Sequence, residues 1–551
     1  MSRMDKWFTP VSIINKRATK PINAPSKGNI DMGTSEQEKP DGIAILDFGG
    51  QYCHLIARRV REMSVYSEIL PCDATLKELD ALEGAMNLKG VILSGSPSSL
   101  RLKDSPRLSE GVLETGLPVL GLCYGHQLMA HMHGGEVRRG EKREYGITEA
   151  TIDAPDGVLK GMDPQERVWM SHGDTVFSLP HEFQIQAHTD ISPVAAFRHK
   201  TKPLHGLQWH PEVVHTRRGK EMLGNFVLDI CECRQNWRPT DSIEKAVEEI
   251  REAVGDSKAI IALSGGVDSS VAAALAARAL GDRLVAVHVD HGLMRMNESD
   301  AVEEAFTKMG VDLIVARVQE RFLEKLRGVS DPEAKRKIIG EEFIRVFEAE
   351  ARRTGAEYLI QGTIYPDRIE SGFRSHSDKI KTHHNVGGLP LDIEFKKIIE
   401  PLRDFYKDEV RALGARLDLP LSIVERQPFP GPGLAVRIIG EVTDEKLEAL
   451  RMADAIVCEE VEASELRDTA WQYLAVLTDT RSTGVKGDER DYGLTVAVRI
   501  VESVDGMTAR FSKAPWDVLE RISTRITNSI PGVTRVVYDI THKPPATIEW
   551  E

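Results

Sequence analysis

The feature that most constrains the fold is an alternation of short aliphatic runs with longer helical stretches. The runs are GIAILDF from residue 42, GVILSG from 90, LPVLGLC from 117, AIIALSG from 259, RLVAVHVDHG from 283 and EYLIQGT from 357. Strands that are buried on both faces of a parallel sheet have this near-continuous apolar character, and helices between them supply the crossovers. The alternation therefore predicts an α/β fold with doubly wound, mainly parallel sheets.

Three departures from this pattern divide the chain. Residues 1–41 are rich in Lys, Pro, Ser, Asn and Gly and lack apolar periodicity, which indicates a disordered leader, within which Met32 could be the true start. The stretches RQNWRPTDS (234–242) and RQPFPGPGLAVR (426–437) interrupt regular structure with proline and glycine. We therefore expect the following domains: 42–238, 239–428 and 429–551. The last is a smaller α+β unit, because strand-like runs such as LTVAVRIVES and RVVYDITH lie between its helical stretches.

Charge and hydropathy exclude several classes of partner. A formal net charge of -14 gives no general attraction to nucleic acid or to an anionic membrane, so a polyanion needs a dedicated pocket. The sequence has neither an apolar run of about 18 residues nor a signal-peptide core at its start, so we expect a cytoplasmic protein without membrane or nucleic-acid partners. Six cysteines are too sparse for a disulfide framework, and Cys231-x-Cys233 lacks a second pair of metal ligands.

The first candidate catalytic residue is Cys123, in the stretch Gly121-Leu122-Cys123-Tyr124-Gly125. The spacing G-x-nucleophile-x-G is typical of an elbow, in which small residues let the chain turn sharply between a strand and a helix. A thiol at a helix N-terminus is favoured as thiolate, and neighbouring backbone N–H groups can stabilise an oxyanion. A free cysteine is also often just a small buried side chain, so the elbow alone leaves both interpretations open.

A partner for this thiol occurs in HGLQWHPEV, residues 205–213. Pro211 disfavours a helical conformation for His210, so His210 and Glu212 should lie in extended chain on one side of it. A histidine oriented by a carboxylate is a general base for a thiol.

GLCYGHQ and GLQWHPEV together resemble the class I glutamine amidotransferases. The resemblance implies a Cys123-His210-Glu212 triad that hydrolyses glutamine to release ammonia. VILSGSPSS resembles the family's oxyanion-hole loop, which implies backbone donors at Gly95 and Tyr124, although Ser96 stands where the family has a second glycine.

A second site is predicted where AIIALSGGVDSS runs from a buried strand into an Ala-rich helix. Glycines allow close approach of the backbone, and the N–H groups and hydroxyls at the helix start form an anion cradle. No Gly-Lys-Ser/Thr follows, which excludes a Walker A loop. SGGVDSS resembles the PP-loop of ATP pyrophosphatases, which implies an adenine-nucleotide alpha-hydrolase-like domain that binds ATP and pyrophosphate. The implied residues are Ser264, Gly265, Gly266, Val267, Asp268, Ser269 and Ser270.

Four other stretches point to the acceptor. THKPPATIEWE, QPFPGPGLAVR, KTHHNVGGLP and GVKGDERDY resemble the glutamine-hydrolysing GMP synthetases, and the resemblance covers about residues 42–551. It implies that the C2 oxygen of XMP is adenylated by ATP and then replaced by ammonia from glutamine, giving GMP, AMP and pyrophosphate. The implied XMP-binding residues are Arg295, Lys381, Lys543 and Glu549. For the segment around Lys381, a solvated surface loop is the alternative.

The same resemblance implies Mg²⁺ with ATP, held in part by Asp268, no prosthetic group, and a homodimer formed through the C-terminal domain. Two other functions stay open at this point. One is a PP-loop amidotransferase with a different acceptor, as in NAD synthetase or asparagine synthetase, which the C-terminal motif disfavours. The other is a nucleotide-binding regulator with an inactive glutaminase, which the complete triad disfavours.

Overall fold

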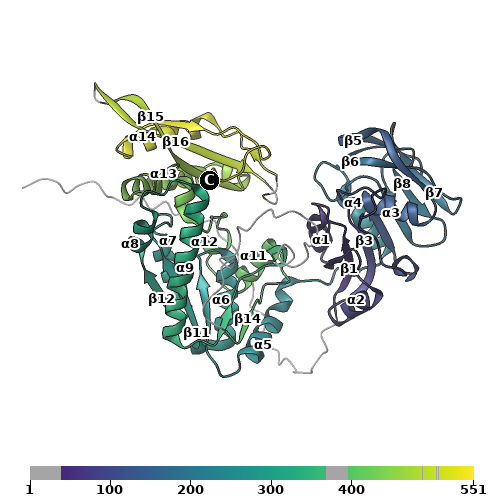
Figure 1. The fold of residues 1–551 in the computed structure, drawn as a ribbon, viewed down its shortest axis with the longest axis horizontal. Coiled ribbons are helices and arrows are strands. Elements are labelled where there is room, and N and C mark those ends of the chain that lie inside the picture. Colours follow the sequence, from purple (N-terminus) through teal and green to yellow (C-terminus); the bar gives the residue numbers. More distant parts are fainter. Residues whose placement is uncertain (1–38, 368–394, 487, 504–505, 507) are drawn as a thin grey trace, which may run out of the picture. The chain divides into compact units, whose positions relative to one another are not determined.

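The computed structural model describes residues 39–367, 395–486, 488–503, 506 and 508–551 (Figure 1). Most of the predicted leader lies outside the described residues, and so does Lys381. Within the described part of the chain, no helix combines the length and the apolar character that a membrane span requires.

The first sheet has nine strands in the order β2-β1-β3-β4-β9-β8-β7-β5-β6. Its parallel half comprises β1 Asp41–Asp47, β2 Tyr66–Pro71, β3 Asn87–Leu93, β4 Val119–Leu122 and β9 Leu204–Leu207. Its antiparallel half comprises β5 Glu136–Ile152, β6 Gln165–Ser178, β7 Phe183–His188 and β8 Ala196–His199. The aliphatic runs thus predicted the parallel half, and the antiparallel strands extend it.

Helices cover both faces of the parallel half. They are α1 Cys53–Arg61, α2 Leu76–Ala81, α3 Tyr124–Met132 and α4 Gly219–Gly224. Alternate residues of β1 divide between two apolar clusters, since Ile43 packs with the α1 side chains and Ala44 packs with those of α3. Burial on both faces explains why this strand is apolar throughout its length.

The second sheet, predicted to be mainly parallel, is parallel throughout, in the order β12-β11-β10-β13-β14. Its strands are β10 Ala259–Leu263, β11 Leu284–Asp290, β12 Asp312–Arg317, β13 Tyr358–Ile360 and β14 Lys397–Ile399. Its helices are α5 Ile243–Val254, α6 Val267–Leu280, α7 Glu298–Lys308, α8 Gln319–Leu326, α9 Pro332–Thr354, α11 Lys407–Arg416 and α12 Leu421–Val424. Ile261 packs with α5, α6 and α11, whereas Ile260 packs with α8 and α9, so helices flank both faces.

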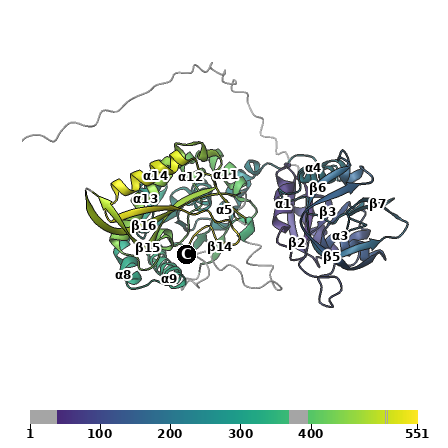
Figure 2. The ribbon, with the colours of Figure 1, turned by 90° about the horizontal axis from the view of Figure 1, so that it is seen from above.

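The third sheet confirms the predicted α+β unit. It contains β15 Gln472–Lys486, β16 Glu489–Glu502, β17 Arg510–Phe511 and β18 Val533–Tyr538, with β15 and β17 antiparallel to β16 and β18 parallel to it. The helices α13 Asp444–Glu462 and α14 Trp516–Ser529 pack against it (Figure 2), and Leu450, Leu477 and Ile522 belong to their shared apolar cluster. The strand-like runs LTVAVRIVES and RVVYDITH correspond to β16 and β18.

Candidate active site

Cys123 occupies a strained turn between β4 and α3. Its φ of 52° and ψ of -101° are rare for a residue with a side chain, and such strain costs on the order of 1–3 kcal/mol. A Cβ at Gly121 would lie 2.5 Å from the carbonyl oxygen of Gly125, and a Cβ at Gly125 would lie 2.6 Å from the Cβ of Leu93. Both flanking positions therefore need glycine, as the elbow spacing predicts.

His210 and Glu212 meet this thiol. The His210 Nδ1 atom lies 2.6 Å from Oε1 of Glu212, and both side chains are buried. A Cβ at Gly95 would lie 3.1 Å from Cε1 of His210 and 3.6 Å from the Cβ of Cys123, so the three residues surround one point. Burial by itself lowers the pKa of His210, but the negative charges of Glu212 and Cys123 outweigh it and raise the pKa well above its ordinary value.

Both residues predicted for the oxyanion hole adjoin Cys123, since Gly95 approaches it in space and Tyr124 follows it in the chain. Tyr124 is the first residue of α3, so its backbone N–H belongs to the end of the helix that carries partial positive charge. The Tyr124 hydroxyl donates to the carbonyl oxygen of Pro106 (2.6 Å), so its side chain is held in the core. Ser94 fixes the loop that contains Gly95, since its hydroxyl accepts from the backbone N–H of Phe48 (3.0 Å) and donates to the carbonyl oxygen of Gly95 (3.1 Å).

Sequence reasoning missed the residues that hold His210 in place. The Thr216 hydroxyl donates to the carbonyl oxygen of His210 (2.6 Å) and accepts from the backbone N–H of Trp169 (3.0 Å). The ring of Tyr52 packs edge-on against the His210 imidazole, with 5.1 Å between centroids. Arg59 donates to the carbonyl oxygen of Glu212 (3.0 Å). Tyr52, Arg59 and Trp169 come from distant segments, so no local motif could have indicated their contacts, whereas Thr216 lies only six residues beyond His210.

The predicted PP-loop lies between β10 and α6. Gly265 has φ +76°, and Gly266 is the residue before the helix. The Ser264 hydroxyl accepts from the backbone N–H of Gly266 (3.3 Å) and lies 3.1 Å from the hydroxyl oxygen of Ser269. The Ala-rich helix has high intrinsic propensity, and the side chain of Val267 anchors its first turn in the core.

Two side-chain oxygen atoms at this loop are free to accept a hydrogen bond or to bind a ligand. Asp268 binds Nζ of Lys407 through Oδ2 (2.8 Å), but its Oδ1 is buried and has no hydrogen-bond partner among the described residues. The Ser270 hydroxyl oxygen is likewise buried and has no hydrogen-bond partner among the described residues. A carboxylate oxygen left over beside an anion cradle is the kind of ligand that Mg²⁺ takes.

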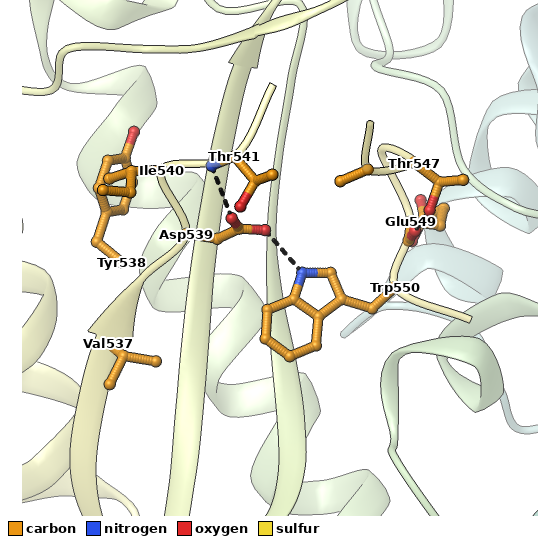
Figure 3. A pocket seen from close by; sticks show the side chains of 9 residues that line it. Val537, Tyr538, Asp539, Ile540, Thr541, Thr547, Glu549 and Trp550 are labelled. Atoms are coloured by element: carbon orange, nitrogen blue, oxygen red, sulfur yellow. Dashed lines mark hydrogen bonds between the residues drawn. The ribbon is translucent and has the colours of Figure 1, made fainter. Parts of the chain in front are cut away.

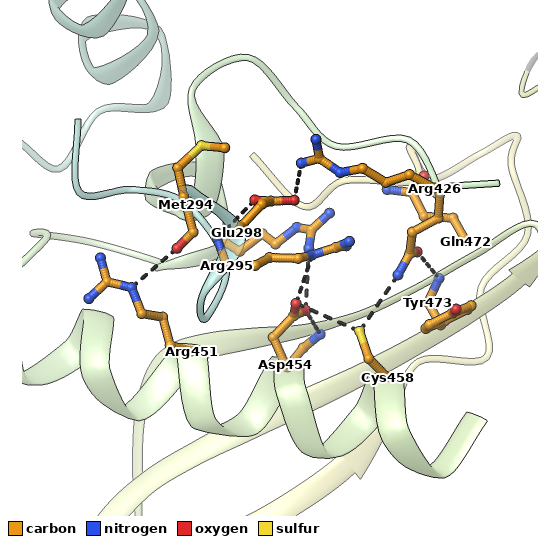
Figure 4. Close-up of polar contacts among 12 residues, drawn as sticks. Met294, Arg295, Glu298, Arg426, Arg451, Asp454, Cys458, Gln472 and Tyr473 are labelled. Carbon is orange, nitrogen blue, oxygen red and sulfur yellow. Dashed lines mark hydrogen bonds and ion pairs between the residues drawn. The ribbon is translucent and has the colours of Figure 1, made fainter. Parts of the chain in front are cut away.

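Charged side chains gather near the predicted nucleotide residues (Figure 4). Arg295 pairs with Asp454 (Nε to Oδ2, 3.0 Å), and Arg437 pairs with the other oxygen of Asp454 (3.3 Å). Arg437 also donates two hydrogen bonds to the Glu549 carboxylate (2.9 and 2.8 Å). Gln472 donates to the same carboxylate (2.8 Å). The structure therefore links Arg295 to Glu549 through buried charges.

The contacts of the two remaining predicted nucleotide residues are different. Lys543 donates to the carbonyl oxygen of Gly506 (2.7 Å), and Lys381 lies outside the described residues. Next to Glu549, a pocket of about 530 Å³ is lined by the end of β18 and the segment after it (Figure 3). In its wall, Asp539 accepts from the Trp550 indole N–H (3.0 Å) and from the backbone N–H of Thr541 (2.9 Å).

Comparison with known proteins assigns each of the three parts of the chain to a protein family. Three family models match: "Glutamine amidotransferase class-I" at residues 44–230, "PP-loop domain" at 239–417 and "GMP synthase C terminal domain" at 459–550. The chain is 52% identical to the glutamine-hydrolyzing GMP synthase of Clostridium tetani over 93% of its own length and 100% of that protein. The corresponding proteins of Acetivibrio thermocellus and Caldicellulosiruptor saccharolyticus are each 53% identical, over 92% of this chain and 99% of theirs.

Proposed function

The chain belongs to the glutamine-hydrolysing GMP synthases, and from that premise we propose which of its residues carry out each half of the reaction. The protein is a ligase that makes GMP with glutamine as nitrogen donor. The two other functions that the sequence left open, a different acceptor and a regulator without glutaminase activity, are set aside by this membership.

The glutaminase half uses the triad. His210 takes the proton of the Cys123 thiol, the sulfur attacks the side-chain amide carbon of glutamine, and the N–H groups of Gly95 and Tyr124 receive the negative oxygen. His210 then gives its proton to the departing ammonia, and water hydrolyses the thioester to glutamate. The observation that carries this assignment is the buried pair of His210 and Glu212 at the elbow cysteine.

The synthetase half uses the PP-loop. The C2 oxygen of XMP attacks the α-phosphorus of ATP while the bond to the bridging oxygen breaks, pyrophosphate leaves with the electron pair, and a ring N–H proton passes to solvent. Ammonia then adds at C2 and AMP leaves with the former C2 oxygen. Asp268 would hold Mg²⁺ through its unpaired Oδ1, and the ion would neutralise the charge that develops on pyrophosphate.

An isotope experiment tests this division. With MgATP, glutamine and XMP labelled with oxygen-18 at C2, we expect GMP, AMP and pyrophosphate, with the label in the phosphate of AMP. Unlabelled AMP, or ADP as the main product, would contradict adenylation at the PP-loop.

A homodimer remains part of the proposal, as does a cytoplasmic location. Exposed apolar side chains on the third sheet and directly after it support self-association: Val485, Tyr492, Val537 and Ile540. Light scattering on the full chain should give twice the monomer mass, and a monomer at micromolar concentration would contradict it.

A further inference from the structure

Arg426 directly contacts the PP-loop, although sequence analysis assigned it no role. Its Nη1 donates to the carbonyl oxygen of Gly265, and its Nη2 pairs with Glu298, the first residue of α7. A Cβ at Gly265 would lie 2.7 Å from Nη1 of Arg426. Glycine is therefore favoured here by the positive φ, and its missing side chain leaves room for this guanidinium.

The same side chain reaches the cluster around Arg295 (Figure 4). Glu298, which pairs with Arg426, also accepts from the backbone N–H of Arg295 (3.1 Å). The guanidinium carbons of Arg295, Arg426 and Arg437 lie 4.8, 5.4 and 5.2 Å from the centroid of one ring, that of Phe429. Arg426 therefore connects the predicted pyrophosphate cradle with the predicted XMP residues.

Unfilled donors around Arg426 indicate a place for an anion, although Glu298, Asp454 and Glu549 already pair with the guanidinium groups. Three guanidinium groups surround one aromatic ring, and two of them keep buried nitrogens without a hydrogen-bond acceptor among the described residues: Nε of Arg426 and Nη2 of Arg295. Burial lowers the pKa of Arg426, Glu298 acts against this, and the charges of Arg295 and Arg437 lower the pKa further. An anion with several oxygens would fill these donors and reduce the mutual repulsion.

We propose that Arg426 is a catalytic residue of adenylation, whose guanidinium binds the α-phosphate of ATP while the XMP oxygen attacks it. The inference rests on the proposed function, with ATP at the PP-loop and XMP beside Arg295 and Glu549. Negative charge on the α-phosphate oxygens must be held as the new O–P bond forms and the bond to pyrophosphate breaks. A cation placed between the two substrates stabilises that charge at the point where it develops.

The alternative is that Arg426 only braces the loop of residues 426–437 against the PP-loop. If Arg426 had only this structural role, its substitution would change the affinity for both nucleotides or the stability of the fold. A cation that acts in the transition state would lower the rate of adenylation and leave both affinities nearly unchanged.

The test is a single-turnover measurement without any nitrogen source. Enzyme in excess is mixed with XMP and MgATP and quenched in acid, and the burst of pyrophosphate gives the adenylation rate. For Arg426→Met we expect a rate about 10²- to 10³-fold below wild type, with the Kd values of XMP and ATP within about threefold. Arg416→Met, at an exposed position of α11, is the matched control and should behave like wild type.

Arg426→Lys keeps the test decisive if the methionine variant does not fold. It retains the charge beside Glu298 but loses the fork of donors, so we expect a burst about tenfold slower than wild type at unchanged affinities. Wild-type bursts for both Arg426 variants, or affinity losses that account for the whole effect, would overturn the proposal. A wild-type enzyme without a pyrophosphate burst would instead refute the proposed function.

Discussion

Nδ1 of His210 lies 2.6 Å from Oε1 of Glu212, and the Glu212 side chain is fully buried. The carboxylate can only accept, so Nδ1 donates to it and Nε2, on the other side of the ring, is left for proton transfer. Two residues that are separated by one proline in the sequence thus form a buried pair, which the proposed function uses as the base and its orienting group.

Glu212→Gln should move the pH dependence of glutaminase activity. The negative charge of Glu212 raises the pKa of His210, so the neutral amide should let that pKa fall. The imidazolium beside the thiolate is then lost at lower pH, so the alkaline limb of kcat/KM against pH should shift to lower pH. We also expect the maximum to drop about 10²- to 10⁴-fold. Glu221→Gln on α4, whose carboxylate is largely exposed, should leave the profile unchanged; an unshifted limb in the Glu212 variant would contradict the assignment.

Cys123→Ala should separate the two activities. Removal of the sulfur abolishes glutamine-dependent GMP formation, whereas high external ammonium should still support it at a rate within about twofold of wild type, because the PP-loop is untouched. Product formation with each nitrogen source measures the difference. Normal use of glutamine by this variant would show that the triad is wrongly assigned.

Cys123 should be the cysteine that a glutamine-like chloroketone labels at neutral pH. Burial raises the pKa of the five other thiols: Cys53, Cys72, Cys231, Cys233 and Cys458. Few thiolates therefore exist at those positions near pH 7, whereas Cys123 has His210 beside it to take its proton. Peptide mapping by mass spectrometry should find one modified site, and labelling of Cys123→Ala at equal speed would refute this.

Gly125→Ala should damage the elbow. The new Cβ would lie 2.6 Å from both the Cβ and the carbonyl oxygen of Leu93, so the helix start must shift. We expect a loss of about 1–3 kcal/mol in the free energy of unfolding and at least a tenfold loss of glutaminase activity. Gly84→Ala, where no atom lies within 4 Å of the added carbon, is the control for denaturant unfolding. Equal stability of the two variants would contradict the packing argument.

Asp268→Asn should depress GMP synthesis with glutamine and with ammonium alike, on the order of 10²-fold, because the lost charge serves adenylation and not ammonia release. The apparent Mg²⁺ requirement should rise at the same time. Asp282→Asn, at an exposed position after α6, should have no effect. If GMP synthesis falls with glutamine but not with ammonium, Asp268 would serve the coupling between the glutaminase and synthetase sites and not the binding of ATP.

Much of the fold could be predicted because it depends on local pattern. Parallel strands that are buried on both faces must be apolar throughout, so their runs were recognisable, and the elbow and the PP-loop each require glycines at fixed spacing next to a strand and a helix. The antiparallel strands β5 and β6 could not be found this way. Their sequences, such as EVRRGEKREYGITEATI, carry many charges because one side of each strand faces solvent.

By itself, the sequence determined the elbow and the Gly-rich loop on which the proposed nucleophile and phosphate site rest, because each is encoded within about ten consecutive residues. Only the tertiary structure decided which commonplace side chains join them. The Trp169 N–H bonds, from 47 residues away, the Thr216 hydroxyl that holds the His210 carbonyl, and Arg426 meets Gly265 from 161 residues away. Nothing in the neighbourhood of a threonine or an arginine signals such a partner, since the contact exists only after separate strands and loops have packed and excluded water between them.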